Sequence, residues 1–402
     1  MDTRVLAPIV QRVYDSIRDV VEQESFTPLL EGFAEAFAMA GVPVDRLQIP
    51  MTKFNGFRHP MLAAIILTWR RGQDVSAIFV PHYESEPTDS LDMGTLEKRV
   101  ANTPYHNLLF ADQLSIRRDL RRVVEPFPIF QELRQEGFID YYASVLDMPS
   151  GSRQIVSLCS GGDGGLGDTV DDCFRALEPV LAMALHSAYL SSVCRQLADT
   201  YIGQLTGRRV LDGEIRRGSR DRLQAGIMFC DVRGFTAMSE TMAGDELVGL
   251  MNTLFECIGE KVEEQGGEIL KFIGDAMLIV YPADHYETDT ALGRALITTA
   301  ISASAAVQTL GEEVGRPLAV GFGAHIGEVL YGNIGTSKRL DFTVMGPAVN
   351  LTSRLESLCK PLGARLAVSA EVAAGNEDLV TDLGEHRLKG VSRARRVFGL
   401  GC

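Results

Sequence analysis

Two acidic residues beside tight glycine turns restrict most strongly how this chain can fold. Asp231 ends the apolar run 225–230 and precedes a segment with helical spacing of apolar residues, so we expect it where a strand passes into a helix. Asp275 follows Gly274 between two further apolar runs, which predicts the turn of a hairpin. Folded together, the strand end and the hairpin tip could place two carboxylates on Mg²⁺. This ion favours one or two protein carboxylates together with phosphate oxygens.

Length and composition narrow the class of protein. The chain has 402 residues, enough for two or three domains, and its net charge of −14 argues against non-specific binding to nucleic acid or to an anionic membrane. No apolar run approaches the roughly 18 to 20 residues of a membrane span, and residues 1–10 lack the layout of a signal peptide. The seven cysteines show no CxxC spacing and the seven histidines show no metal-ligand spacing. We therefore expect a cytoplasmic protein with reduced thiols.

Residues 1–188 are expected to form an α+β domain that opens with an amphipathic helix. Strand-like runs follow at 47–49, 61–69, 75–80, 141–146 and 154–157, with helical patterns at 127–136 and 171–190. This order, with FQELRQEGF at 130–138 leading into two strands, a glycine-rich loop and a long final helix, resembles that of GAF domains. The resemblance implies a sensor module that binds a small ligand or dimerises, and the sequence names no ligand.

The glycine-rich loop at 162–167 formally matches the dinucleotide fingerprint GxGxxG. That fingerprint joins a first strand to its helix within a βαβ unit, whereas this loop comes at the end of an α+β domain. A sensor-domain loop that leads to a helix cap, with Asp168 or Thr169 as the capping residue, is the favoured interpretation.

Residues 189–222 are expected to be a signalling linker that begins as a helix over 189–205. Its second half holds six arginines with acidic residues among them: Arg208, Arg209, Arg216, Arg217, Arg220 and Arg222. A nucleic-acid-binding patch is one interpretation. The interleaved acids and the negative charge of the chain favour a solvated or interdomain surface.

Residues 223–402 alternate strand and helix signals, which predicts a mixed sheet with helices. Strands are expected at 225–230, in a hairpin at 268–281, at 318–326 with a hairpin partner at 328–333, and at 341–345; helices are expected at 238–264, 290–314 and 347–360. Four motifs follow in order: FCDVRGFT from Phe229, EILKFIGDAMLIVY from Glu268, GAHIGEVLYGNIG from Gly323 and RLDFTVMGPAVNLTSRLE from Arg339. Together they resemble the catalytic domain of class III adenylyl and guanylyl cyclases, which implies a ferredoxin-like α+β fold.

The resemblance implies a metal and phosphate site. Asp231, Asp275 and the backbone carbonyl of Val232 would bind two Mg²⁺ or Mn²⁺ ions per active site. Phe235 and Thr236 would offer backbone amides to phosphates at the start of a helix. The alternative for either acid alone is that it caps a turn.

The resemblance also assigns catalytic roles to the helix that starts near residue 347. Asn350 and Arg354 are four residues apart and so share one face. The asparagine would orient the ribose, and the arginine would stabilise the charge that develops on the phosphoryl group. A surface ion pair between Arg354 and Glu356 is the alternative. Lys338 or Arg339 in the preceding loop would bind the terminal phosphates.

Lys271 and Thr343 match the base-reading pair of the family. An ammonium group donates to an adenine acceptor, whereas guanylyl cyclases carry a glutamate at the first position, so Lys271 indicates ATP. The second position is usually Asp in the animal transmembrane-type enzymes. Thr343, with Asp341 two residues earlier, resembles the threonine-bearing subclass of mainly bacterial cyclases. His325 is expected to be a packed strand residue.

In this family two catalytic domains share each active site, the acids coming from one and the base-reading lysine, the asparagine and the arginine from the other. Because this chain carries both sets, we expect a homodimer that the N-terminal domain and the linker regulate. The principal prediction is an adenylyl cyclase that converts ATP to cyclic AMP and pyrophosphate. A guanylyl cyclase and a catalytically silent dimeric sensor module are the alternatives, while residues 274–277 lack the GG(D/E)EF signature of diguanylate cyclases.

Overall fold

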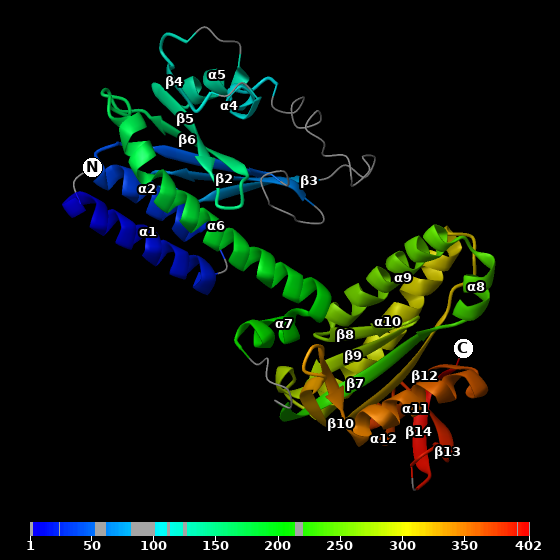
Figure 1. The fold of residues 1–402 in the computed structure, drawn as a ribbon. Helices are drawn as coiled ribbons and strands as arrows, with labels where there is room; N and C mark the ends of the chain where they lie inside the picture. Colours follow the sequence, from blue (N-terminus) through cyan, green and yellow to red (C-terminus); the bar gives the residue numbers. More distant parts are fainter. Residues whose placement is uncertain are drawn as a thin grey trace. The chain divides into compact units, whose positions relative to one another are not determined.

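The computed structural model describes residues 3–23, 25–52, 62–81, 101–110, 113–123, 127–213, 220–391 and 393–401. The chain divides into two compact units, Met1–Cys194 and Arg195–Cys402 (Figure 1). The predicted start of a strand at Met61 and the linker arginines Arg216 and Arg217 lie outside the described residues.

Six described strands form an antiparallel sheet in the first unit. They are β1 (Arg46–Thr52), β2 (Leu62–Arg70), β3 (Ser76–Pro81), β4 (Ser115–Asp119), β5 (Asp140–Asp147) and β6 (Arg153–Ser160). They lie in the order β3-β2-β1-β6-β5-β4, and every neighbouring pair is antiparallel. The α+β class predicted for this part of the chain is confirmed, since five of these strands overlap the predicted runs.

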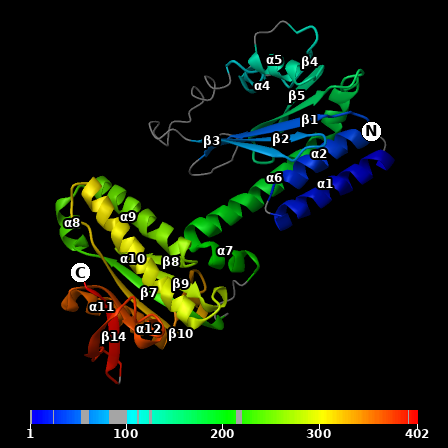
Figure 2. The same cartoon turned by 180° about the vertical axis from the view of Figure 1, so that it is seen from behind.

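Helices pack against both faces of this sheet (Figure 2). On one face lie α1 (Thr3–Gln23), α2 (Thr27–Met39) and the first part of α6 (Val170–Ile202). On the other face lie α4 (Tyr105–Phe110) and α5 (Pro128–Gln135). The alternation of a strand produces these two cores, because Tyr142 packs with the first set of helices and Tyr141 with the second. The helix predicted at 171–190 continues to Ile202, into the predicted linker.

The second unit contains a mixed sheet, as predicted. Its strands are β7 (Arg220–Val232), β8 (Glu268–Ile273), β9 (Ala276–Pro282), β10 (Val320–Gly335), β11 (Leu340–Met345), β12 (Ala364–Ser369), β13 (Thr381–His386) and β14 (Arg395–Gly401). The order is β13-β14-β12-β10-β7-β9-β8, and β11 pairs with β10. β10 and β12 are parallel, while the other neighbours are antiparallel.

β10 differs from its prediction. The sequence analysis placed a hairpin between 318–326 and 328–333, but these residues form one continuous strand. The reason is long-range pairing, since β7 accompanies β10 without a break from Val320 opposite Val232 to Gly332 opposite Arg220. The hairpin forms further on, between β10 and β11, where the Thr336 N–H donates to the Arg339 carbonyl oxygen at 2.8 Å.

Two long helices cover one face of this sheet, α9 (Gly244–Glu264) and α10 (Asp289–Glu313). A separate short helix, α8 (Phe235–Thr241), precedes α9, so the single helix predicted at 238–264 is in fact two. Among the described helices, α10 alone is long and apolar enough to cross a membrane, judged by length and composition. Half of its most apolar stretch is buried inside the unit. Its Leu292 and Leu296 lie in the core beneath the sheet, as expected of a core helix.

The other face of the sheet is covered by α7 (Gln204–Leu211) and α11 (Pro347–Leu362) over only part of its area (Figure 1). Val210 of α7 and Ala348 of α11 pack on the apolar side chains of this face. The Thr206 and Tyr331 hydroxyls are 2.7 Å apart and fix α7 to β10. The unit is completed by the one-turn helices η2 (Ala283–His285) and α12 (Ala370–Ala373).

Candidate active site

Asp231 and Asp275 are brought together at one edge of the second sheet. Asp231 lies near the end of β7, opposite Ala276 of β9, and Asp275 lies in the two-residue turn between β8 and β9. The predicted hairpin is therefore confirmed. The Val232 N–H points to the Asp275 carbonyl oxygen at 3.4 Å, which ties the strand end to the turn. Burial and then the negative charge of Asp275 raise the pKa of the Asp231 carboxyl.

Arg233 lies between Asp231 and a third carboxylate, which the sequence analysis did not assign to this site. Its Nη1 is 3.4 Å from Asp231 Oδ1 and 3.1 Å from Glu356 Oε1 on α11. Burial and then the charge of Asp231 raise the pKa of Glu356. Glu356 thus contacts Arg233 and not Arg354, the partner considered from the sequence. Arg233 is thus shared by two carboxylates, while Asp231 also has the negative charge of Asp275 beside it and the positive charge of Lys360 acting against it.

Two glycines of β10 permit this arrangement. A Cβ on Gly321 would lie 1.6 Å from Nη2 of Arg233, and a Cβ on Gly323 would lie 2.2 Å from the backbone nitrogen of Glu356. A side chain at Gly323 would clash with the backbone of α11, and one at Gly321 would displace the Arg233 guanidinium. Arg233 and α11 therefore lie directly on the backbone of β10.

Asn350 and Arg354 lie on the exposed side of α11, one turn apart, as the sequence spacing predicts. Their side chains make no hydrogen bond or ion pair with any of the described residues. The opposite side of the helix is buried through Leu351 and Leu355. The two polar side chains are therefore available to a molecule that approaches this face.

Lys271 pairs with an acid of β11. Its Nζ is 2.6 Å from Asp341 Oδ2. Thr343 follows Asp341 by two residues on the same strand, so both lie on one side of β11, and Thr343 is only 9% exposed. Lys271 and Asp341 line a cavity of about 1180 Å³ within the second unit, together with residues that include Phe272 and Asn333.

Known proteins resemble the part of the chain that builds this site. Residues 219–398 match the family described as "Adenylate and Guanylate cyclase catalytic domain". These residues form a class III nucleotidyl cyclase domain. The predicted family is thus confirmed for the second unit.

Among similar proteins is an adenylate cyclase of Anabaena cylindrica, 32% identical over 214 residues, which are 52% of this chain and 41% of that protein. Adenylate cyclase 1 of Rhizobium meliloti is 30% identical over 181 residues, 44% of this chain and 27% of that protein. The chain spans less than half the length of these two relatives. Among solved structures, the adenylyl cyclase CyaB from P. aeruginosa is 26% identical with a TM-score of 0.42, over 46% of this chain and 96% of that one.

Within one cyclase domain the predicted site residues form separate groups. The described residues that line the cavity beside Lys271 include neither Asp231 nor Asp275. Phe235 and Thr236 start α8, close in sequence to the acids, and Thr236 is exposed. The two acids therefore lie together, and Lys271 lies with Asp341, but the two pairs do not line the same pocket.

Lys338 and Arg339 lie in the exposed turn between β10 and β11, where Thr336 Oγ1 accepts hydrogen bonds from both backbone N–H groups. Their side chains are exposed on this turn. His325 is buried in β10, with Nδ1 2.8 Å from Ser369 Oγ, and burial lowers its pKa. The prediction of a packed strand histidine is confirmed.

Two of the described linker arginines, Arg209 and Arg222, face acids of the same unit. Arg209 Nη1 is 2.8 Å from Asp221 Oδ2, and its guanidinium lies 5.1 Å from the centre of the Tyr331 ring. Arg222 is 3.1 Å from Glu328. This pairing agrees with the predicted solvated surface.

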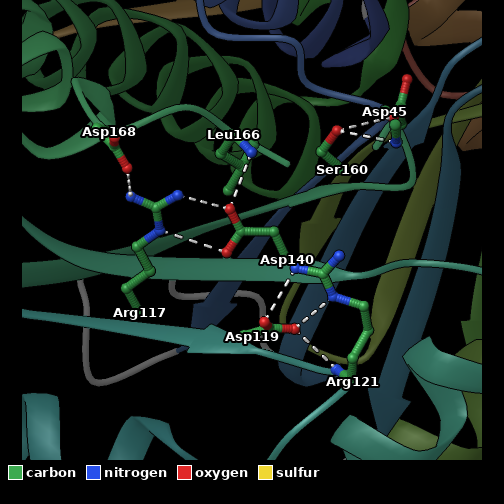
Figure 3. Close-up of polar contacts among 9 residues, drawn as sticks. Asp45, Arg117, Asp119, Arg121, Asp140, Ser160, Leu166 and Asp168 are labelled. Atoms are coloured by element: carbon green, nitrogen blue, oxygen red, sulfur yellow. Dashed lines mark hydrogen bonds and ion pairs between the residues drawn. The ribbon is translucent and has the colours of Figure 1, made fainter. Parts of the chain in front are cut away.

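In the first unit, acids of the sheet hold the glycine-rich loop (Figure 3). Asp140 Oδ2 accepts from the Leu166 N–H at 2.9 Å and from Arg117 at 2.8 Å. Asp45 accepts from the Gly161 N–H at 2.9 Å. Because the strand before this loop pairs antiparallel with its neighbours, the βαβ setting of a dinucleotide fingerprint is absent from the described sheet.

Proposed function

We propose that the chain is an adenylyl cyclase that converts ATP to 3′,5′-cyclic AMP and pyrophosphate. The observation that carries the proposal is the meeting of Asp231 and Asp275 at one sheet edge of a cyclase domain. Lys271, at the base-reading position, supports adenine as the base. Two of the similar proteins are named adenylate cyclases, which agrees with this choice.

Asp231, Asp275 and the carbonyl group of Val232 would hold two Mg²⁺ or Mn²⁺ ions. The donor set fits, because burial and then the charge of the adjacent Asp275 raise the pKa of Asp231, and a divalent cation would relieve both effects. Among the described residues no group of three or more His, Cys, Asp or Glu side chains forms a closed metal site. Substrate phosphates would complete the coordination, as Mg²⁺ prefers. Bound metal ions would lower the pKa of the ribose 3′-hydroxyl and neutralise charge on the triphosphate.

The remaining side chains would bind and orient the nucleotide. The Lys271 ammonium, oriented by Asp341, would donate to an acceptor of adenine, with Thr343 as a second polar contact. Asn350 would hold the ribose so that its 3′-hydroxyl lies in line with the leaving pyrophosphate. Arg354 would stabilise the negative charge that grows on the α-phosphate.

The phosphate chain would contact residues at both ends of the site. Phe235 and Thr236 would present backbone amides at the start of α8, near the two acids. Lys338, exposed in its turn, would neutralise the terminal phosphates. These contacts would hold the substrate while the 3′-hydroxyl attacks.

We also propose that the enzyme is a cytoplasmic homodimer in which each active site draws on two chains. The separation of the acids from the Lys271 cavity supports this arrangement. Residues 1–188 would act as a GAF-like sensor domain, and residues 189–222 would transmit its state to residues 223–402. The antiparallel sheet with helices on both faces supports the GAF-like assignment.

The test is a turnover assay of the purified full chain with ATP and GTP side by side, in Mg²⁺ and in Mn²⁺. We expect cyclic AMP as the main product and a lower kcat/KM for GTP. Cyclic GMP as the main product would replace the proposal by a guanylyl cyclase. No cyclic product from either nucleotide, with a folded dimer present, would favour a silent sensor module.

A further inference from the structure

Arg46 in the first unit is a buried cation that forms no ion pair with any residue that the structure describes. It begins β1, is 4% exposed, and lies directly opposite Cys159 of β6. Cys159 belongs to the core under α4 and α5, so the Arg46 side chain points into that core as well. Nε and Nη1 of Arg46 are buried and have no hydrogen-bond partner. These two atoms carry three N–H hydrogens, and a guanidinium stays protonated throughout the accessible pH range.

The acids of this neighbourhood are already paired with other arginines. Burial raises the pKa of the Cys159 thiol to about 12, the positive charge of Arg46 opposes this rise, and the charges of Glu136 and Asp140 add to it. Both acids therefore lie near the thiol. However, Glu136 binds Arg70 at 3.1 Å. Asp140 binds Arg117 at 2.8 Å, as Figure 3 shows. Neither acid is left to neutralise Arg46.

Two tyrosine hydroxyls lie beside the same guanidinium. Burial raises the pKa of Tyr105 and of Tyr141, and the charge of Arg46 acts against the rise in both. The Tyr105 hydroxyl donates to Gln48 Oε1 at 3.1 Å. The Tyr141 hydroxyl is adjacent to that of Tyr105, but it is buried and makes no well-formed hydrogen bond. Arg46 and Tyr141 thus place unpartnered donors in one buried region.

A buried charge with no partner is strongly destabilising, and so is a buried donor with no acceptor. An exposed arginine would avoid this cost by reaching water, but α4 and α5 enclose the core into which Arg46 points. A group that brings negative charge and acceptor oxygens would satisfy both residues at once. The described side chains around Arg46 do not supply such a group.

We propose that Arg46 and Tyr141 form a binding site for a small oxyanion, either a carboxylate or an inorganic anion such as bicarbonate or phosphate. The guanidinium supplies the charge and three N–H donors, and the tyrosine supplies an O–H donor. Such a ligand gives the proposed sensor domain a defined chemical class of signal. That the anion regulates catalysis rests on the proposed cyclase activity. That it binds at Arg46 does not rest on that activity.

The test uses the single tryptophan of the chain. Trp69 lies on β2 and packs against the core of the first unit, so its fluorescence reports the unfolding of that unit within the full chain. Thermal unfolding of dialysed protein is followed with sodium acetate, bicarbonate or phosphate, each against sodium chloride at equal ionic strength. For at least one of the three anions we expect a saturable rise of the midpoint by several degrees. The three probes distinguish a carboxylate from an inorganic anion.

Variants locate the effect. Arg46→Met is expected to abolish the rise, and Tyr141→Phe is expected to weaken the apparent affinity about tenfold, the loss of one hydrogen bond to a charged group. Arg122→Met removes an arginine of the same unit whose side chain is 87% exposed, and it should keep the full response. Arg46→Lys retains the charge and should respond at higher anion concentration, so it replaces Arg46→Met if that variant does not fold.

The unliganded proteins give a second measurement. Without added oxyanion, Arg46→Met should unfold at the wild-type midpoint or above it, because an apolar side chain removes an uncompensated charge. The absence of any anion-specific rise in the wild type would overturn the proposal. So would a rise that persists in Arg46→Met, or one that Arg46→Lys shows at the same anion concentration as the wild type. Cyclase turnover is measured separately on the same samples, so failure of the anion site leaves the proposed activity standing, and the reverse also holds.

Discussion

Asp140 in the first unit and Asp231 in the second are both strand carboxylates beside an arginine, but their charges are balanced differently. Asp140 has Arg117 at 2.8 Å and the Leu166 N–H at 2.9 Å, and it fastens the glycine-rich loop (Figure 3). Asp231 shares Arg233 with Glu356 and faces Asp275. The first carboxylate is compensated within its own chain. The second is not, which is the condition of a residue that awaits a cation from outside.

Arg46 shows the same imbalance with the opposite sign. Two of its buried nitrogen atoms have no hydrogen-bond partner, whereas Arg70 and Arg117 of the same unit each bind a carboxylate. Compensated pairs in this chain hold segments together. The two proposals made above place a ligand, a metal ion or an oxyanion, at the groups that lack such a partner.

The largest effect is expected from removing the uncompensated acids. Asp231→Ala or Asp275→Ala should lower turnover at least about a thousandfold, because the loss of a metal ligand costs several kcal/mol of transition-state stabilisation. The dimer should remain intact by size-exclusion chromatography. Asp284→Ala, which removes an exposed acid of the same unit, is the control and should leave turnover unchanged. Near-wild-type formation of cyclic nucleotide in either acid variant, with Mg²⁺ or Mn²⁺, would show that this acid is not a metal ligand that catalysis needs.

A mixing experiment tests whether the acids of one chain act with the helix of another. Asp231→Ala subunits and Arg354→Ala subunits are each expected to be inactive. Mixed, they should regain turnover, because one site of each heterodimer has both sets of residues intact. Tag pull-down establishes that subunits exchange. Exchange without recovery of activity would show that the site is not shared between chains.

A smaller effect on turnover is expected at Lys271, because Asp341 already neutralises its positive charge. Lys271→Glu combined with Thr343→Cys should lower the ratio of kcat/KM for ATP over GTP about a hundredfold, since a mispaired polar group at the base costs a few kcal/mol. Efficient use of GTP is not expected, because hydrogen bonds also depend on placement. The ratio is measured in wild type and in the double variant, and an unchanged ratio would mean that these positions do not read the base.

The smallest effect on activity is expected from the compensated acid. Asp140→Asn should destabilise the first unit by about 2 kcal/mol, less than a fully buried pair, because Arg117 is 36% exposed and can reach water. Trp69 fluorescence reports the fall in the unfolding midpoint. Turnover should stay within about twofold of wild type. Asp163→Asn, an exposed acid in the glycine-rich loop, should leave the midpoint unchanged. A large loss of turnover in Asp140→Asn without unfolding would mean that Asp140 does more than fasten the loop.

Local patterns predicted the elements whose partners are close in sequence. The apolar runs around Gly274 and Asp275 contain the whole β8–β9 hairpin, so the turn and its acid followed from the sequence. The spacing of Asn350 and Arg354 likewise placed both on one face of α11. The pairing of β10 with β7 is not local, and a glycine in the middle of β10, Gly327, suggested a turn where a neighbouring strand keeps the chain extended.

Local sequence patterns could not predict which charged side chains find a partner of opposite charge. Arg233 and Glu356 belong to separate motifs, and only the packing of α11 on β10 brings them together. Arg46 is a charged residue at the start of a strand, a position that is usually exposed. Its burial depends on α4 and α5, which come much later in the chain.

Gly321 precedes the third of the four motifs, and a methyl group there would occupy the place of the Arg233 guanidinium. With Gly323 it allows α11, which carries Asn350 and Arg354, to pack directly on β10, and β10 pairs with β7, the strand that carries Asp231. In the proposed dimer with shared sites, Asp231 of one chain would serve one site and α11 of the same chain would serve the other. Because the two are linked by direct packing through β10, we expect substrate binding at one site to affect the other, so that the two sites would not turn over independently.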